Sequence, residues 1–201
     1  MRSLCAALVT IGAVGWAGGA AASQQTGITV LGGGLGQACS EAVIWGEAGT
    51  SVDRICTQAL ATEMMSPKDR AGTFVNRGVV RLRDRRYEDA KQDFSVALRL
   101  RPDLPEAYVN RGAAQIGARR YAEAVADLDK GLSMGVIEPQ KAYYNRALAY
   151  EMWGNSKAAY DDYKKAHEIA PLWELATDQF FRFSFLHAEL KEAPSSSTPN
   201  P

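Results

Sequence analysis

From residue 37 onward, apolar residues recur at the three- and four-residue intervals that are typical of amphipathic helices. One helix is expected from Gln37 to Trp45, and a second begins at Thr50 or Ser51. The turn Gly46-Glu47-Ala48-Gly49 separates them, so residues 37–66 are predicted to form an antiparallel helical hairpin. Its apolar positions are Ala38, Ala42, Val43, Trp45, Val52, Ile55, Leu60 and Met64.

A three-residue phrase then occurs three times. Asn76-Arg77-Gly78 returns 34 residues later (76 to 110) as Asn110-Arg111-Gly112, and 35 residues after that (110 to 145) as Asn145-Arg146-Ala147. An Asp follows 16 residues after each Arg. These residues are Asp93, Asp127 and Asp162. A period near 34 predicts an array of helical hairpins.

This pattern resembles the tetratricopeptide repeat family, in which aromatic and small residues recur over two helices. The repeats are expected at residues 71–104, 105–138 and 140–173, with Pro139 as one extra residue. The matching positions are Phe74, Arg77, Gly78, Arg81, Ala90, Phe94, Ala97 and Pro102; Tyr108, Arg111, Gly112, Gln115, Ala124, Leu128, Gly131 and Val136; and Tyr143, Arg146, Ala147, Tyr150, Ala159, Tyr163, Ala166 and Pro171. The resemblance implies an all-α helical-hairpin repeat solenoid, with residues 67–191 as its tetratricopeptide domain.

Small residues stand where the two helices of each repeat should meet. We expect the first-helix set to face the second-helix set, because small side chains let the backbones approach closely. The first set is Gly78, Gly112 and Ala147, and the second is Ala90, Ala124 and Ala159. The larger residues of the next column are expected to fill the gap to the following repeat. They are Phe94, Leu128 and Tyr163.

The recurring Arg departs from the Leu that is usual in the family. We expect it to pair with the Asp that follows 16 residues later and so to join the two helices of one repeat. The expected pairs are Arg77–Asp93, Arg111–Asp127 and Arg146–Asp162. Pairing with a neighbouring repeat is the alternative. A partly buried Arg–carboxylate pair is often bidentate, so we expect these pairs to be structural.

By the resemblance, the first helices of the repeats line a groove that binds a peptide or protein. The positions expected to face it are Val75, Asn76, Val79, Asn110, Ala113, Tyr144, Asn145 and Leu148. An amide can donate to and accept from an extended backbone. Alternatively, the Asn residues serve helix geometry or bind water. The family's carboxylate clamp is not expected, because Val75 replaces its Lys and Lys141 alone matches a basic column.

A second candidate surface is basic and lies at the turns inside the first two repeats. Its members are Arg81, Arg83, Arg85, Arg86, Arg119 and Arg120. Such an edge could meet an acidic partner or anionic lipid. The simpler interpretation is a solvated turn that Asp84, Glu88 and Asp89 neutralise.

Cys39 and Cys56 lie at equal distances from the turn of the leading hairpin, because their midpoint falls between Glu47 and Ala48. Residues equidistant from an antiparallel turn lie level with each other, so we predict a disulfide. Closing a loop of this size stabilises the fold by about 3 kcal/mol in the chain-entropy model. The alternatives are two buried thiols and a redox pair, although the latter usually has a CxxC spacing, which is absent here.

The N-terminal residues have the pattern of an export signal. Arg2 precedes an apolar run, Leu4 to Val14, and Ala20-Ala21-Ala22 offers small residues for cleavage. Residues 1–22 are therefore interpreted as a signal peptide cleaved near Ala22, since the run is short for the alternative, a membrane anchor. With the two cysteines, this suggests a bacterial periplasmic location, and a generic secreted location is the alternative.

Three further segments complete the chain. Residues 23–36 are expected to be a flexible lead-in, in which Ile28, Val30 and Leu31 could form a short extended piece packed on the array. Residues 173–190 should cap the array, although the alternation of Phe181, Phe183 and Phe185 predicts that the helix ends near Phe183. Residues 192–201 are rich in Pro and Ser and should be disordered.

Composition adds little evidence for chemistry. The 201 residues include 23 basic and 23 acidic side chains, so no overall field favours nucleic acid. Neither His167 nor His187 belongs to a metal-ligand spacing, and no nucleophile motif is present. We expect a non-catalytic interaction module without cofactor or metal. The alternatives are a structural adaptor that uses its basic edge or convex surface, and a small enzyme of unrecognised type.

Overall fold

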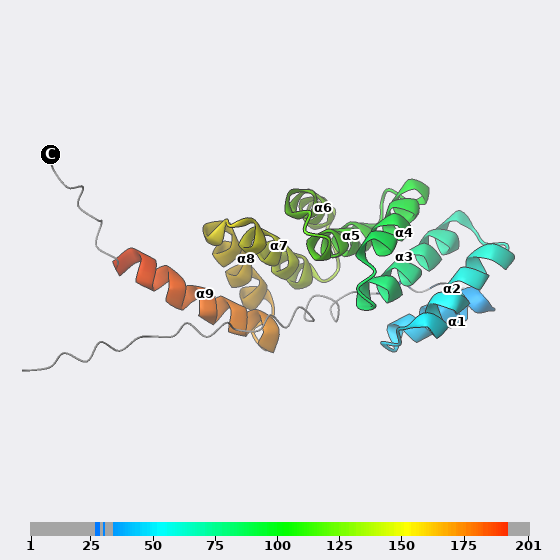
Figure 1. Ribbon diagram of the computed structural model, residues 1–201, viewed down its shortest axis with the longest axis horizontal. Helices are drawn as coiled ribbons and strands as arrows, with labels where there is room; N and C mark the ends of the chain where they lie inside the picture. The colour runs from blue at the N-terminus through cyan, green and yellow to red at the C-terminus, as the bar shows by residue number, and fades with distance from the viewer. Residues whose placement is uncertain (1–26, 29, 31–33, 193–201) are drawn as a thin grey trace, which may run out of the picture.

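The computed structural model describes residues 27, 28, 30 and 34–192, with the backbone alone for 186–192. In this part of the chain all regular structure is helical (Figure 1). The helices are α1 (Leu35–Ile44), α2 (Thr50–Thr62), α3 (Pro67–Arg83), α4 (Tyr87–Leu100), α5 (Pro105–Gly117), α6 (Tyr121–Ser133), α7 (Pro139–Trp153), α8 (Ser156–Ile169) and α9 (Glu174–Glu192). The expected signal peptide and nearly all of the expected tail lie outside the described residues.

The helices form a row of antiparallel hairpins in chain order, α1–α2 at one end and α7–α8 near the other (Figure 1). The first helices α1, α3, α5 and α7 also contact one another in that order, so they form one layer, here called the first-helix layer. α9 packs on α8 at the end of the row. The predicted fold class, an all-α solenoid of three repeat units with a leading hairpin and a C-terminal cap, is confirmed.

Helix ends follow local sequence chemistry. The Ser66 hydroxyl caps α3 by accepting from Asp69 N–H, and Pro67 occupies the first turn. Pro105 and Pro139 likewise occupy the first turns of α5 and α7. α1 takes its cap from another helix end, because the Glu63 carboxylate accepts from the backbone N–H groups of Leu35 and Gly36.

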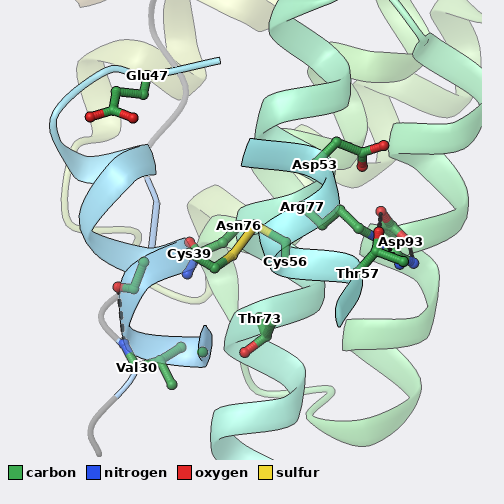
Figure 2. The surroundings of a disulfide bond; sticks show 12 residues. Val30, Cys39, Glu47, Asp53, Cys56, Thr57, Thr73, Asn76, Arg77 and Asp93 are labelled. Carbon is green, nitrogen blue, oxygen red and sulfur yellow. Dashed lines mark hydrogen bonds and ion pairs between the residues drawn. A yellow bond between two sulfur atoms is a disulfide. The ribbon is translucent and has the colours of Figure 1, made fainter. Parts of the chain in front are cut away.

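The predicted disulfide between Cys39 and Cys56 is confirmed (Figure 2). It joins α1 to α2 with the two Cα atoms 5.0 Å apart. Both cysteines are fully buried. The leading hairpin is therefore held covalently at the level where its helices face each other.

The small residues of the repeats are required by close packing. A Cβ on Gly78 would lie 2.6 Å from the Phe94 ring. A Cβ on Gly112 would lie 2.8 Å from Leu128 and 3.2 Å from the carbonyl oxygen of Ala124. The large side chain of the second helix therefore approaches the glycine of its own repeat, in addition to the Ala column expected there.

The expectation that the C-terminal helix ends near Phe183 is wrong, because α9 continues to Glu192. Phe183 is 6% exposed and buried with Ala176, whereas Phe181 and Phe185 are 51% and 72% exposed. The apolar contacts of α9 thus recur at helical spacing through Ala176, Phe180 and Phe183. The alternating phenylalanines lie on different helix faces and do not disturb the helix.

The described helices include none that is long and apolar enough to cross a membrane.

Candidate functional site

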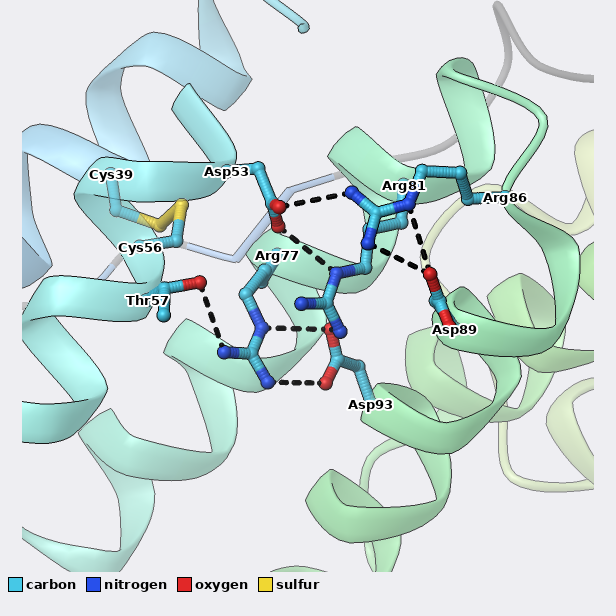
Figure 3. Close-up of polar contacts among 9 residues, drawn as sticks. All are labelled: Cys39, Asp53, Cys56, Thr57, Arg77, Arg81, Arg86, Asp89 and Asp93. Atoms are coloured by element: carbon cyan, nitrogen blue, oxygen red, sulfur yellow. Dashed lines mark hydrogen bonds and ion pairs between the residues drawn. A yellow bond between two sulfur atoms is a disulfide. The ribbon is translucent and has the colours of Figure 1, made fainter. Parts of the chain in front are cut away.

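The three recurring arginines each hold the Asp that follows 16 residues later. In the first repeat, Arg77 Nε and Nη2 donate to Asp93 Oδ2 and Oδ1 at 3.0 and 2.7 Å (Figure 3). In the second, Arg111 donates to Asp127 at 2.7 Å through both nitrogens. In the third, the distances from Arg146 to Asp162 are 2.7 and 2.8 Å. All three expected pairs are present, and each joins the two helices of one repeat.

The remaining guanidinium nitrogen reaches the preceding hairpin. Arg77 Nη1 donates to Thr57 Oγ1 at 3.1 Å, Arg111 Nη1 to Ser95 Oγ at 3.3 Å, and Arg146 Nη1 to Asp129 Oδ1 at 2.5 Å. The alternative of pairing between repeats therefore occurs together with pairing within a repeat. Each Arg consequently holds three helices.

Aromatic rings and carboxylates surround the guanidiniums of these arginines. Each guanidinium lies over the ring three residues earlier, at 5.4 Å for Arg77, 5.6 Å for Arg111 and 5.3 Å for Arg146. The hydrogen bond to Asp127 raises the pKa of Arg111, and the bond to Asp162 raises that of Arg146. The Arg of the repeated motif therefore holds neighbouring helices together.

The first repeat carries a larger ion-pair network (Figure 3). Arg81 donates to Asp93 at 2.8 Å and to Asp53 of α2 at 3.0 Å. Arg86 contacts Asp53 at 3.0 Å and Asp89 at 2.7 Å. Burial acts to raise the pKa of Asp53, but the hydrogen bonds and charges of Arg86 and Arg81 together lower it.

Most of the basic candidate surface is engaged within the protein. Arg83 Nη1 donates to the carbonyl oxygens of Val43 and Glu47, and Arg120 pairs with Glu88 at 2.8 Å. Arg85 and Arg119 are exposed, and both have left-handed backbone conformations, with φ of 59° and 60°. The edge thus presents less positive charge than its sequence indicates.

The side-chain amide of Asn76 forms two hydrogen bonds with the backbone of Ile28. Asn76 is fully buried on α3; its Oδ1 accepts from Ile28 N–H at 2.6 Å, and its Nδ2 donates to Ile28 O at 2.7 Å. The Ser40 hydroxyl of α1 donates to the same Ile28 oxygen at 3.0 Å and accepts from Val30 N–H at 3.1 Å. Two side chains from two first helices therefore hold the backbone of the lead-in.

Asn145 occupies the matching position on α7, and its environment differs. It is 2% exposed, and among the described residues its Oδ1 has no hydrogen-bond partner. A buried amide oxygen without a partner costs about 1–3 kcal/mol. Asn110, on α5 between them, is equally buried at 2% exposed. The Asn column thus contains one amide that is satisfied by a peptide backbone and one with an unused acceptor.

The apolar positions expected to face the groove lie deeper than that expectation implies. Val75 and Val79 are fully buried in the core that α1 to α5 share, and Ala113 belongs to the same cluster. Tyr144 packs against Tyr163 and Trp173, with ring centroids 5.5 and 5.2 Å away. These four positions are filled core, whereas Leu148 is half-buried.

Tyr144 remains a protonated hydroxyl over the whole physiological range. Burial, reinforced by the charge of Glu151, raises the pKa of Tyr144 to about 12. The hydroxyl can therefore donate a hydrogen bond but cannot supply negative charge at neutral pH. Within the described residues, no group of three or more His, Cys, Asp and Glu side chains is placed to hold a metal ion.

Sequence reasoning missed several partners in these networks. Thr57, Ser95 and Asp129 differ in residue type and in their distance from the Arg that each contacts, so they leave no repeating signal. Ser40 was missed because its partners are backbone groups. The Asp53 link could have been suspected, because a carboxylate opposite the extra Arg81 of the first repeat satisfies that cation.

Known proteins share the fold. Residues 141–171 match the tetratricopeptide repeat family. A comparison with curated protein sequences gives no match. The structure of MamA is similar with a TM-score of 0.62 and 18% identity, over 79% of this chain and 87% of that chain.

Two further similar structures are tetratricopeptide domains. The Arabidopsis OM64 domain has a TM-score of 0.57 and 21% identity, over 60% of this chain and 99% of that one. The first such domain of Spaghetti (RPAP3), bound to the HSP90 peptide SRMEEVD, has a TM-score of 0.56 and 21% identity, over 60% and 95%. The chain therefore folds as a tetratricopeptide repeat solenoid, and its third repeat carries that family's sequence pattern.

Proposed function

We propose that this protein is a non-catalytic interaction module that binds an extended segment of a partner protein along its first-helix layer. The observation that carries the proposal is the Asn76 amide, which both accepts from and donates to one residue of extended backbone. Backbone atoms are common to all peptides, so such a contact holds a segment independently of its side chains.

The repeat places the same side chain on α5 and α7. Asn145 has a buried Oδ1 without a partner among the described residues, and a backbone N–H from a bound segment would satisfy it. Binding would then remove a desolvation cost that the free protein carries. Asn110 lies between the two, so the three amides form a ladder along the row.

The proposed ligand differs from a terminal carboxylate. The structure of Spaghetti with its HSP90 peptide supports peptide binding by this fold. In this chain, however, Val75 precedes the first Asn of the column and is fully buried. An internal, extended segment is therefore the better fit, with Leu148 as an accessible apolar contact.

We also propose that the protein works outside the cytoplasm, in a bacterial periplasm, after removal of residues 1–22. The buried disulfide supports this proposal because such bonds persist in oxidising compartments. Mass spectrometry of the protein recovered from a periplasmic fraction should give an N-terminus at Ser23 or close to it. Recovery of an uncleaved chain from the cytoplasm would contradict the proposal.

The test of binding uses the full chain and a displayed library of unstructured peptides. Peptides selected on the unmodified protein should lose about five- to twelvefold in affinity for Asn145→Ala, because one backbone hydrogen bond contributes about 1–1.5 kcal/mol. Lys157→Ala is the control, since Lys157 is exposed on α8 in the opposite layer. Equal affinity of Asn145→Ala and the control variant would refute the proposal.

A surface adaptor that uses the basic edge is the weaker candidate. Arg81, Arg86 and Arg120 are held in ion pairs, which leaves Arg85 and Arg119 as the exposed cations of the edge for which no pairing is seen among the described contacts. Charge reversal at Arg85 and Arg119 is expected to leave peptide binding unchanged. Loss of binding in that double variant would favour the adaptor.

A further inference from the structure

The end of the first-helix layer that α1 and α3 form already has an occupant. We propose that the lead-in segment, defined by Gly27, Ile28 and Val30, is an intramolecular ligand that a partner segment of the same pattern displaces. That pattern is a glycine followed by β-branched residues at alternate positions. The inference rests on the proposed function and adds to it the class of partner and a competitor within the chain.

The lead-in segment is held as a bound peptide would be. Four hydrogen bonds join its described backbone to the Asn76 amide and the Ser40 hydroxyl, which would serve any extended backbone equally well. The same amide therefore cannot hold a partner segment while it holds Ile28. A partner segment can therefore bind at this end of the layer only when it replaces the lead-in segment.

The contacts around the lead-in segment favour a small residue followed by branched ones. A Cβ on Gly27 would lie 2.7 Å from Val43 Cγ1 and 3.1 Å from Asn76 Oδ1, so a side chain does not fit there. On α3, a Cβ on Gly72 would lie 3.2 Å from Val30 Cγ2 and 3.4 Å from Ile28 Cγ2. The side chains of Ile28 and Val30, two residues apart in the segment, thus both pack against α3 at Gly72.

The site can survive the exchange because α1 is fixed independently of the lead-in segment. The disulfide ties α1 to α2, and Glu63 caps its first turn. Departure of the segment would leave Ser40 and Asn76 in place with their polar atoms unpaired. Those atoms then favour the entry of a second extended backbone.

The experiment uses the full chain and a fluorescent peptide with the lead-in's own sequence, Gln-Gln-Thr-Gly-Ile-Thr-Val-Leu-Gly. The variant Gly27→Val should expel the segment, because the added side chain clashes with Val43. The residues that hold the segment, Ser40 and Asn76, remain unchanged. The variant should bind the peptide at least about tenfold more tightly than the unmodified chain, because an occupied site lowers apparent affinity by the fraction that is open. Adding Asn76→Ala to Gly27→Val should abolish this gain.

A peptide with Val in place of its Gly is the matched control, and it should bind neither form. Equal affinity of the Gly27→Val variant and the unmodified chain, with the helical circular dichroism retained, would overturn the inference. So would a gain that persists in the double variant with Asn76→Ala.

A second measurement needs no substitution. Excess peptide added to the unmodified chain should accelerate hydrogen exchange at the Ile28 and Val30 amides, which Asn76 and Ser40 protect when the segment is bound. Unchanged protection at saturating peptide would refute displacement. If Asn145→Ala still weakens library peptides while these two tests fail, the intramolecular ligand is wrong and the proposed function stands.

Discussion

Asp93 is the carboxylate on which the first repeat depends most heavily. Its side chain is 3% exposed, and it accepts from both Arg77 and Arg81. The substitution Asp93→Ala would leave two guanidiniums beside a small void between α3 and α4. We therefore expect a large loss of stability at this position.

The size of this loss of unfolding free energy depends on the contacts that Arg77 and Arg81 keep after the substitution. Removing one partner of a buried pair costs about 3–5 kcal/mol. The Arg77 and Arg81 side chains are 14% and 15% exposed, so water reaches them in part, and Arg81 keeps its contact with Asp53. These two effects place Asp93→Ala at the lower end, about 3 kcal/mol of unfolding free energy.

The other repeats provide an internal comparison. Asp127 pairs with Arg111 alone among the ion pairs described and is 11% exposed, so Asp127→Ala should cost less, about 2 kcal/mol. Asp89→Ala is the surface control, and it should cost at most about 0.5 kcal/mol because that side chain is 45% exposed.

Urea denaturation followed by circular dichroism, with the disulfide intact, gives the three unfolding free energies. The expected order of loss is Asp93→Ala, then Asp127→Ala, then Asp89→Ala. If Asp93→Ala were no more destabilising than Asp127→Ala, the argument from the number of arginines served would fail.

Three further predictions concern backbone strain, pH and the disulfide. Arg85→Gly should raise the unfolding free energy by up to about 1 kcal/mol, because glycine relieves the strain of a left-handed backbone. Gly154→Ala, at φ 87°, should lower the unfolding free energy by a similar amount. Urea denaturation that gives the opposite signs would refute this prediction. Because the pKa of Asp53 lies below its ordinary 3.8, its stabilisation is present above pH 3.8 and lost as pH falls through the lowered pKa; thermal melts should show this acid-side loss reduced in Asp53→Asn. Reduction of Cys39–Cys56 should cost about 3 kcal/mol, measured by urea denaturation with and without reductant.

Features that repeat with the period of the array could be predicted from the sequence. The spacing from Arg77 to Asp93 recurs in all three repeats, and the helical hairpin geometry brings those residues together. The disulfide followed from the equal distances of Cys39 and Cys56 from one turn. These inferences succeeded because local helix geometry alone determines which side chains meet.

Contacts that use backbone atoms or non-repeating residues could not be predicted. Asn76 has the residue type and position of a ligand-binding side chain, yet its partner is the backbone of Ile28, 48 residues earlier. Tyr144 was assigned to an open surface because the packing of Trp173 against it depends on how the chain turns after α8. The alternation of three phenylalanines predicts too short an α9, because the helical spacing of Ala176, Phe180 and Phe183 determines how this helix packs.

The contacts that the three recurring arginines make with the preceding hairpin are not equally sensitive to ionic strength. Arg77 and Arg111 reach back to neutral hydroxyls, whereas Arg146 reaches back to Asp129, whose side chain is 52% exposed. Salt screens an exposed charge pair far more than a hydrogen bond to a hydroxyl. Dissolved salt therefore weakens the backward contact of Arg146, between the second and third repeats, more than the backward contacts of Arg77 and Arg111. The exposed pair Arg120–Glu88 gives the joint between the first and second repeats a salt-sensitive contact of a different kind.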